Sequence, residues 1–487
     1  MAGAGGDDAG SAHCRSPSRR YSVKGATRQP SDGEAAVSAS PPFAFTRARI
    51  PQGFPLYKTD ASAYYSSMPR CIRKGRASFL PSMQAARVST NLIFTTPQRA
   101  LKPSMLDLDK GHLTEEVRHF REQLRRYIDK EVRPQAQQWD EDGLVPDATY
   151  RTMGELGFLG LAIPEAFGGS DLDACGTVVF GEELGRSGSG GFAASMSDHA
   201  DMAAPVIVRA GTEDQKKRFL PDIAAGRRRL GFAVTEPSGG SDLTRMKASA
   251  VRQGEHWILN GQKTFITGAL SADMFVTIVR TDPGSKGANG FSVFVIERGG
   301  PGFSTGRKFE KTGWRAADMS EIFFEDLAVP DANMLGEEGK GFHLLMQGLE
   351  RERLSFSAQC IGMMERTMEL TLDFVKNRAA YGRTLWDLQS IRHELAGYAG
   401  ELSAAKLLVY HAAAKKNRGE SVRLETSMLK AQLPQLLKRM ADGCTQMHGA
   451  TGYMHGTEIE RIFRDARPFS LGGGAAAVML DEVAKLL

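Results

Sequence analysis

Residues 233–242 read AVTEPSGGSD, and residues 260–269 read NGQKTFITGA. The first string is a polar turn of small residues, in which Gly239 and Gly240 allow the backbone to come close to a ligand. The nearby runs HWILNG, MFVTIVRT and FSVFVIE are rich in β-branched and aromatic residues, and Gly, Asn and Asp separate them. This pattern predicts short strands joined by turns. We therefore expect a central β-domain over residues 230–335.

Helical patterns lie on both sides of this β-region. In TEEVRHFREQLRRYIDKEVRPQAQQW, apolar residues such as Val117, Phe120 and Leu124 recur at three- and four-residue spacing. Thr114 is a suitable N-cap for this helix, because acidic residues follow it in the first turn. Long helical patterns return after the β-region. The predicted fold is α+β and multi-domain, with an N-terminal helical domain (111–229), the central β-domain (230–335) and a C-terminal helical bundle (336–487).

The first 110 residues are typical of a leader. They are rich in Ser, Arg, Ala and Pro and have no sustained hydrophobic period. Residues 68–105 contain no Asp or Glu, but they contain several Arg and Lys and many hydroxyl residues. This composition indicates a mitochondrial transit segment and location in the mitochondrial matrix. A disordered extension without a targeting role is the alternative, and another organelle stays open.

The distribution of charge argues against a nucleic-acid partner. The chain has a formal net charge of +5, which alone would favour acidic partners. Residues 1–106 carry 15 Lys+Arg and 5 Asp+Glu, which leaves 47 basic and 52 acidic residues in the remainder. The basic excess therefore lies in the leader, and a nucleic-acid role loses its electrostatic support.

Neither a membrane span nor a metal site is expected. No uninterrupted apolar run is long enough to cross a bilayer, so we expect no integral membrane segment. The five cysteines are scattered and include no CxxC pair. The sequence therefore implies neither a disulfide framework nor a zinc site.

The strings of the body resemble those of the acyl-CoA dehydrogenase family, and they occur in the family's order. The resemblance runs from about residue 113 to the C-terminus. It rests on AVTEPSGGSD, NGQKTFITGA, GWRAADMSEIFFEDLAVP (313–330), RAAYGRTLWDLQ (378–389), QMHGATGY (446–453) and RIFRDAR (461–467). The resemblance implies an N-terminal helical domain, a central β-domain and a C-terminal four-helix domain, in agreement with the patterns above.

The resemblance also implies FAD as the cofactor, held partly by the β-domain. Thr235 and Thr267 would hydrogen-bond the flavin ring, Phe265 would cover one face of the ring, and Phe232 would lie beside the same site. Ser241 would serve both the pyrophosphate of FAD and the pantetheine of the substrate. The alternative is that TEPSGGSD is only a polar loop between strands.

A second set of matching residues lies in the C-terminal domain. By resemblance, Arg378, Gln389, Gln446 and Gly449 hold the adenosine and pyrophosphate of FAD, partly from a neighbouring subunit. A homotetramer or homodimer is therefore implied. A guanidinium suits a diphosphate because its fork can form paired hydrogen bonds. For Arg378, the alternative is an exposed arginine at a helix end.

The reaction of this family needs a carboxylate that takes the α-proton of the thioester while the β-hydrogen leaves as hydride. Many relatives carry this Glu near the C-terminus, but Gly473 occupies that position here. A branch that includes the long-chain and isovaleryl enzymes carries the base on a long helix, where Glu352 of GLERERLSF matches it. By the same resemblance, Glu350 lies near the CoA moiety and Arg353 contacts the substrate. The alternative for this run is a solvated charged face.

Three functions stay in competition. The first is dehydrogenation of a medium-chain, long-chain or branched acyl-CoA to the trans-2-enoyl-CoA, with electrons passed to electron-transfer flavoprotein as in fatty acid β-oxidation. The second is an acyl-CoA oxidase, which the end of the chain at Leu487 disfavours because oxidases are generally longer there. The third is a non-catalytic acyl-CoA-binding or scaffold relative. Gly473 makes the third reasonable, and Glu352 argues against it.

Overall fold

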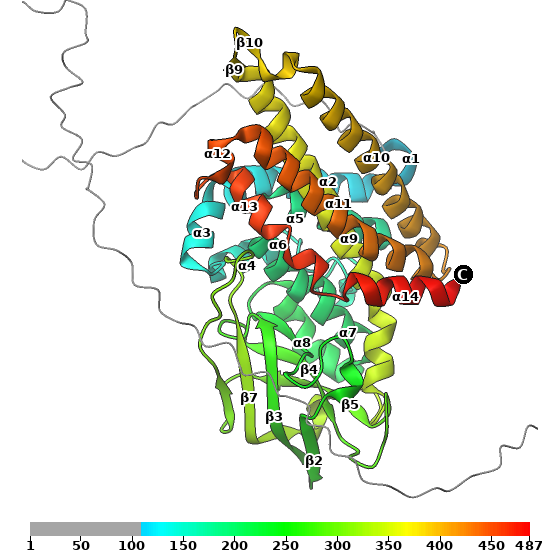
Figure 1. Cartoon of the computed structure of the whole chain (residues 1–487). Coiled ribbons are helices and arrows are strands. Elements are labelled where there is room, and N and C mark those ends of the chain that lie inside the picture. The colour runs from blue at the N-terminus through cyan, green and yellow to red at the C-terminus, as the bar shows by residue number, and fades with distance from the viewer. Residues whose placement is uncertain (1–108) are drawn as a thin grey trace, which may run out of the picture. The chain divides into compact units, whose positions relative to one another are not determined.

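The computed structural model describes residues 109–487 (Figure 1). The predicted leader lies outside the described residues except for its last two, and so does the predicted transit segment at 68–105. The N-terminal helices are α1 (Asp109–His112), α2 (Glu115–Tyr127), α3 (Ala136–Asp142), α4 (Asp147–Glu155), α5 (Ala174–Arg186), α6 (Gly190–Ser197), α7 (Ala204–Ala210) and α8 (Glu213–Ala224).

Local sequence signals account for the first long helix and for a turn farther on. The predicted cap of α2 is confirmed, because the Thr114 hydroxyl accepts a hydrogen bond from Val117 N at 3.3 Å. Val117 and Leu124 are buried, as their spacing predicts. Between α6 and α7 the chain widens into a π-helical turn over Asp198–Ala203. Such turns often occur at functional sites.

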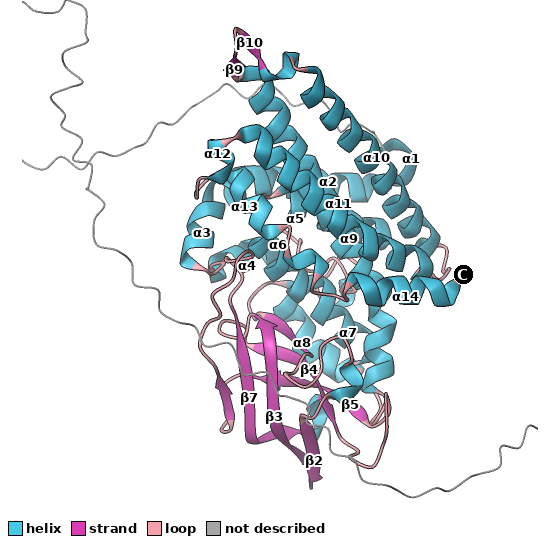
Figure 2. Ribbon diagram, viewed as in Figure 1, coloured by secondary structure: helices cyan, strands magenta, loops and turns pink. Residues whose placement is uncertain are grey.

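The central part is an eight-stranded sheet with the order β6-β7-β3-β2-β4-β5-β8, and β1 pairs in parallel with β4. Figure 2 shows these strands gathered at one end of the described chain. β4 and β5 are buried on both faces, because α7 and α8 cover one face and the long strands β3 and β7 cover the other. The strands are β1 (Leu230–Ala233), β2 (Ser249–Gln253), β3 (His256–Thr267), β4 (Met274–Arg280), β5 (Phe291–Glu297), β6 (Phe303–Thr305), β7 (Met319–Pro330) and β8 (Met334–Leu335).

The C-terminal part is built around α9, which packs against α5, α10 and α11, while α14 packs against α11. A short hairpin of β9 (Ala379–Ala380) and β10 (Arg383–Thr384) separates α9 from α10. The helices are α9 (Gly341–Asn377), α10 (Gln389–Asn417), α11 (Arg423–His448), α12 (Ala450–Tyr453), α13 (Glu458–Asp465) and α14 (Ala476–Leu486). The predicted fold class, helical then β then helical, is confirmed. The residue boundaries of the three domains stay predictions.

Two further findings concern the helices. α9 has 37 residues, so it extends over about 55 Å and runs from the sheet to the far end of the bundle (Figure 1). Within residues 109–487, no helix combines the length and the apolar character that a membrane span requires.

Gly362 permits the close contact of α5 and α9, so we expect Gly362→Ala to destabilise the fold. A Cβ atom on Gly362 would lie 1.9 Å from the backbone oxygen of Glu182. Because backbone must move to relieve this overlap, the expected loss is about 1–3 kcal/mol or more in the free energy of unfolding, measured by urea denaturation. Gly400→Ala on α10 is the control, because its Cβ meets nothing within 4 Å. Equal stabilities of the two variants would contradict this account.

Candidate active site

The carboxylate of Glu352 lies beside the segment that joins α13 to α14. Glu352 is on α9, and Gly473 lies between α13 and α14 with a φ of +67°. A Cβ atom on Gly473 would stand 3.2 Å from Glu352 Oε1. A larger side chain at position 473 would therefore compete with Glu352 for the same space. The two positions that the sequence analysis compared meet at one place in the fold.

Lys430 of α11 holds the segment between α13 and α14 in place. Its ammonium group donates to the backbone oxygens of Phe469 at 2.8 Å and Gly474 at 3.1 Å. Its Cε lies 3.2 Å from the Cβ position of Gly473, the same distance as Glu352 Oε1. The sequence analysis missed Lys430. The only signal was a lysine within the apolar run LKAQLPQLL, and such a residue need not be buried.

The environment of Glu352 favours a basic carboxylate. The residue keeps intermediate exposure, but protein atoms surround its carboxyl group closely. This desolvation raises the pKa of Glu352, and the positive charges of Arg353 and Lys430 lower it in part. Burial also raises the pKa of Asp198, with a smaller contribution from the charge of Glu352. A carboxylate with a raised pKa accepts a proton more readily than an ordinary surface carboxylate.

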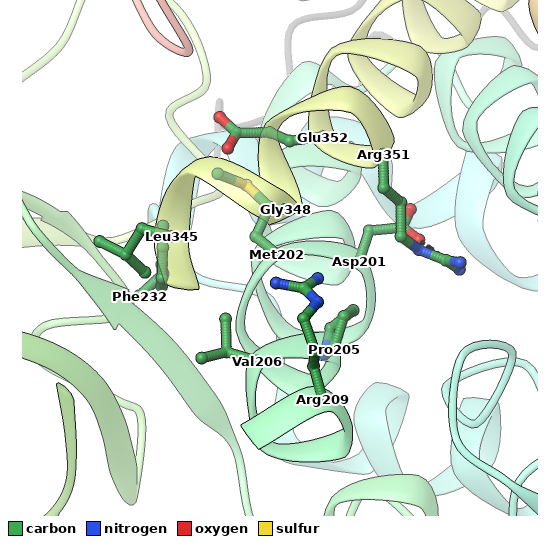
Figure 3. Close-up of a pocket in the computed structure, with 10 residues that line it drawn as sticks. All are labelled: Asp201, Met202, Pro205, Val206, Arg209, Phe232, Leu345, Gly348, Arg351 and Glu352. Atoms are coloured by element: carbon green, nitrogen blue, oxygen red, sulfur yellow. Dashed lines mark hydrogen bonds and ion pairs between the residues drawn. The ribbon is translucent and has the colours of Figure 1, made fainter. Parts of the chain in front are cut away.

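A narrow pocket opens beside Glu352 (Figure 3). It lies between the π-helical turn with α7 on one side and α9 on the other, and Phe232 of β1 also lines it. The space at its centre is about 10 Å³, which is roughly the room that one water molecule needs. Phe232 and Glu352, which sequence analysis assigned to one site, are therefore brought together.

A partly buried ion pair lines one side of this pocket, and the sequence analysis missed it. The guanidinium of Arg351 lies 3.4 Å from Asp201 Oδ1, and the Ser355 hydroxyl donates to Asp201 Oδ2 at 2.8 Å. Figure 3 shows Arg351 and Asp201 together, with the Glu352 carboxylate directed away from them. Arg351 and Glu352 are neighbours in sequence, so the run ERER is not one solvated face.

The loop at Thr235 is joined to β3 by paired hydrogen bonds. The Thr235 hydroxyl donates to Thr264 O at 2.5 Å, and Thr264 N donates to Thr235 O at 2.9 Å. Because a hydroxyl has one proton, Thr235 in this arrangement offers only acceptor lone pairs to a ligand.

Beneath this loop lies the buried ion pair of Glu236 and Lys263. Their side chains are 3% and 0% exposed, and Lys263 Nζ lies 2.7 Å from Glu236 Oε1. Glu236 also accepts from the backbone nitrogens of Lys247 at 2.6 Å and Ala248 at 3.1 Å. Burial lowers the pKa of Lys263 to about 8, although the charge of Glu236 opposes this shift. The Glu236 carboxylate therefore joins the start of the TEPSGGSD loop to Lys247 and Ala248, which follow the loop.

A β-bulge in β3 directs Phe265 outward. The register against β7 shifts between Lys263 and Ile266, and Phe265 has a φ of +58°. Its side chain is 65% exposed and packs on one side against Phe309, with ring centroids 5.6 Å apart. An aromatic residue with positive φ is strained, and strain of this kind concentrates at functional sites. Phe265 thus presents a free aromatic face at the end of the sheet.

Thr267 and Ser241 lie near the same end of the β-domain. Thr267 is the last residue of β3 and is partly exposed. Ser241 is exposed on the loop that the Glu236–Lys263 pair holds. Thr235 and Thr267 offer hydroxyl groups near Phe265 in the chain, and these residue types suit a flavin ring.

The second set of predicted cofactor residues gathers at the opposite end of α9. Arg378 directly follows α9, and Gln389 begins α10. Gln446 and Gly449 lie at the C-terminal end of α11, where His448 approaches Thr371 of α9 at 3.3 Å. All four predicted residues are exposed. Glu352 and Arg378 are separated by 26 positions of sequence, or about 39 Å along the helix.

The two predicted substrate residues on α9 have different surroundings. Glu350 accepts hydrogen bonds from Lys416 at 3.0 Å and Ser421 at 2.9 Å. Arg353 is 8% exposed, donates to the Ser427 hydroxyl at 3.0 Å, and has a buried Nε without a partner. Glu350 is therefore tied to the α10–α11 loop, and Arg353 has an unused donor.

Among residues 109–487, no group of three or more His, Cys, Asp or Glu side chains is arranged to hold a metal ion. His448 stacks on Phe374 with ring centroids 4.3 Å apart, and burial lowers its pKa to about 4.

Comparisons with known proteins agree with this architecture. Three family models match consecutive parts of the chain: the acyl-CoA dehydrogenase N-terminal domain at 114–227, the middle domain at 231–327 and the C-terminal domain at 339–487. The mouse mitochondrial long-chain specific acyl-CoA dehydrogenase is 35% identical over 372 residues, which are 75% of this chain and 85% of that protein. An acyl-CoA dehydrogenase of Bacillus subtilis is 33% identical over 77% of this chain and 99% of its own length.

Solved structures of acyl-CoA dehydrogenases also align with this chain. The acyl-CoA dehydrogenase of Geobacillus kaustophilus aligns with a TM-score of 0.75 and 37% identity, over 77% of this chain and 99% of that one. A glutaryl-CoA dehydrogenase from Mycobacterium smegmatis in complex with FADH2 aligns with a TM-score of 0.73 and 25% identity, over 78% and 96% of the two chains.

The fold and these matches define a three-domain oxidoreductase. The chain belongs to the acyl-CoA dehydrogenase family. Both the predicted enzyme class and the predicted dependence on FAD are confirmed. The exposed ring of Phe265 and the neighbouring hydroxyls of Thr235 and Thr267 fit the cofactor of this family. FAD supplies the hydride acceptor of the reaction when it is bound.

Proposed function

We propose that this enzyme converts an acyl-CoA thioester to the trans-2-enoyl-CoA, with Glu352 as the base that removes the α-proton. The observation that carries the proposal is the position of Glu352. Its desolvated carboxylate lies in the pocket that Phe232 lines and beside Gly473, whose lack of a side chain leaves room for it. Bound FAD would supply the acceptor for the β-hydrogen, which leaves as hydride. We assign Arg353, Glu350 and Ser241 to substrate binding, with the unused Nε of Arg353 as the strongest support.

The test is anaerobic titration of the purified flavoprotein with a series of acyl-CoAs. Loss of the oxidised flavin absorption with one class of acyl chain is the expected result. A bound flavin that no acyl-CoA bleaches would favour the non-catalytic alternative.

We place this enzyme in the branch with the helix-borne base. The mouse long-chain enzyme and an isovaleryl-CoA dehydrogenase of Pongo abelii, 32% identical over 77% of this chain, are among its relatives. The first name supports a long acyl chain and the second a branched one. We propose a medium-chain, long-chain or branched acyl group as substrate and a role in fatty acid β-oxidation. A subunit of the caffeyl-CoA reductase–Etf complex of Acetobacterium woodii is 33% identical over 77% of this chain, which supports electron-transfer flavoprotein as acceptor. Rapid reoxidation by oxygen alone would favour an oxidase.

We infer that a second copy of the chain completes each cofactor site, in a homotetramer or homodimer. Phe232, three residues before Thr235, lines the same pocket as Glu352, whereas Arg378 lies about 39 Å farther along α9, beyond the reach of one extended dinucleotide. Tyr381, near Arg378 in sequence, and Tyr453 and Met454, near Gly449 in sequence, are 93%, 85% and 59% exposed, and large exposed side chains of this kind suit a subunit contact. Arg378, Gln389, Gln446 and Gly449 of one copy would then hold the adenosine and pyrophosphate of FAD on the other. A monomer that retains FAD would contradict this arrangement.

We propose the mitochondrial matrix as its location, on the composition of residues 68–105. A fluorescent protein fused after residue 110 should enter mitochondria. Its retention in the cytosol would contradict the assignment.

The activity should fall on acidification at a higher pH than an ordinary glutamate would give. Glu352 must be ionised to accept the α-proton, and desolvation raises its pKa. The acidic limb of kcat/KM should therefore lie above the ordinary pKa of about 4.3. Lys430→Met removes a positive charge that lowers this pKa, so its acidic limb should move further upward. A limb at or below the ordinary value, or one unmoved in Lys430→Met, would contradict the role of this environment.

A further inference from the structure

Glu352 borders two different spaces. Its Oε1 lies 3.2 Å from the Cβ position of Gly473, on the side where the base would meet its substrate. Glu352 also lines the narrow pocket drawn in Figure 3, and no residue of the segment between α13 and α14 lines that pocket. The base therefore has a second neighbouring space, whose contents bear on what happens to the proton that it removes.

This narrow pocket has a polar side that reaches the surface. The side chain of Asp201 is 0% exposed and that of Arg351 is 18% exposed. Arg209 is an exposed residue, and Figure 3 shows its guanidinium across the pocket from Glu352. The rest of the lining is apolar or glycine: Met202, Pro205, Val206, Phe232, Leu345 and Gly348. A short polar route thus leads from the base to solvent at Arg209.

One water molecule fits the polar side. The centre of the pocket has about 10 Å³ of room, and a water needs roughly this much space and two or more polar partners. The buried Nε of Arg351 has no acceptor among residues 109–487. Asp201 accepts from Arg351 and Ser355, but a carboxylate has lone pairs for further donors. A water that accepts from Arg351 Nε and donates to Asp201 would satisfy both groups.

Gly348 leaves room for the Glu352 carboxyl group to reach this water. It precedes Glu352 by four residues, so the two lie on one face of α9. Long side chains on a helix lean toward the turn before them. The nearest neighbour of a Cβ atom on Gly348 would be Arg209 Nη1, at 3.4 Å. Figure 3 shows the carboxylate turned away from Asp201, and rotation about its own side-chain bonds would bring it over Gly348.

We propose that the narrow pocket holds a water molecule through which Glu352 releases the α-proton to solvent while the CoA thioester is still bound. The proposal rests on the proposed role of Glu352 as base and adds the step that restores it. The O–H bond of protonated Glu352 breaks and an O–H bond forms on the water, which passes one of its own protons to bulk water beside Arg209. One proton leaves and no electron moves. Asp201 and Arg351 are positioning residues that hold the water.

Exchange of the α-protons of a bound analogue with deuterium tests this route. In 3-thiaoctanoyl-CoA a sulfur atom replaces the β-carbon, so the base can remove an α-proton but no β-hydride can follow. The FAD-loaded enzyme, in excess over the analogue in D₂O, should exchange these protons faster than the analogue dissociates. Mass spectrometry measures the exchange, and stopped-flow displacement measures the dissociation. If the proton left only after dissociation, exchange would not exceed the dissociation rate.

Substitutions at Gly348 test whether the proton uses the narrow pocket. Gly348→Leu extends a side chain into it and should slow exchange by about tenfold or more, relative to flavin bleaching by octanoyl-CoA, because a single bleaching event requires no proton to leave Glu352. Gly348→Ala adds one methyl group at ordinary contact distance and should slow exchange less. It replaces Gly348→Leu if that variant does not fold. Gln347→Leu is the matched control, since Gln347 is the adjacent exposed residue and does not line the pocket.

The failures of the two proposals differ. Exchange no faster than dissociation in the parent, or equal exchange in the parent and the folded Gly348 variants, would overturn the water route even if acyl-CoAs still bleach the flavin. Slowing of equal size in Gln347→Leu would also overturn it. Failure of every acyl-CoA to bleach the flavin would overturn the proposed function, while the exchange of the thia analogue would still report on the route, because it requires only proton transfer.

Discussion

Glu352→Gln should bind acyl-CoA and FAD as the parent does, but its turnover should fall by about 10²–10⁴-fold. Glutamine has nearly the same shape as glutamate and fills the space beside Gly473, but it cannot accept the α-proton. Flavin bleaching under single-turnover conditions measures the loss directly, and calorimetry with an S-alkyl-CoA measures binding. The combination of retained binding and lost bleaching distinguishes a missing base from a damaged pocket.

Asp373→Asn is the control for this experiment. Asp373 is an exposed carboxylate on the same helix, and its side chain accepts a hydrogen bond from Asn377 at 3.2 Å. The contact is exposed, so its loss should cost at most about 1 kcal/mol of stability. The turnover of Asp373→Asn should stay within about tenfold of the parent. If Glu352→Gln turned over as fast as the parent, the assignment of the base would be wrong.

Glu236→Gln should destabilise the fold by about 3–5 kcal/mol and weaken FAD binding. The substitution leaves the buried ammonium of Lys263 without a counter-charge, and breaking a buried ion pair on one side has a cost of this size. The loop from Thr235 to Lys247 loses the carboxylate that joins its two ends. Because Thr235 and Ser241 belong to this loop, flavin should dissociate more readily. Urea denaturation and ultrafiltration of the yellow protein measure the two effects.

Glu420→Gln breaks a surface pair and provides the comparison. Arg418 and Glu420 lie 2.7 Å apart with side chains 57% and 47% exposed, so the expected change is below about 1 kcal/mol. A similarly small effect of Glu236→Gln would mean that the buried pair does not hold the loop. Loss of stability without loss of flavin would separate folding from cofactor binding.

The sequence predicted those features that depend on neighbouring residues. The cap at Thr114 and the apolar face of α2 follow from helical spacing, and the strands around TEPSGGSD follow from β-branched runs divided by turn residues. The order of the strings then led to the family. Each helix or strand signal lies within about ten residues of chain, where local geometry decides the structure.

Features that depend on distant segments were not accessible from the sequence. Nothing in the strings placed Lys430 against the carbonyls of Phe469 and Gly474, or paired Arg351 with Asp201. The charged run at 350–353 illustrates the difficulty, because its members have unlike surroundings although they are adjacent in sequence. Glu350 pairs with the α10–α11 loop, Arg351 faces the π-helical turn, and Glu352 meets Gly473.

By itself, the sequence determined the helical–β–helical order, the family and the presence of glycine at position 473. Only the tertiary structure decided that Glu352 lies in the space beside that position and that the predicted cofactor residues fall into two sets at opposite ends of α9. The physical reason is that helix and strand patterns are set by side-chain periodicity along the chain. The surroundings of a buried charge, by contrast, are set by segments that meet only when the domains pack.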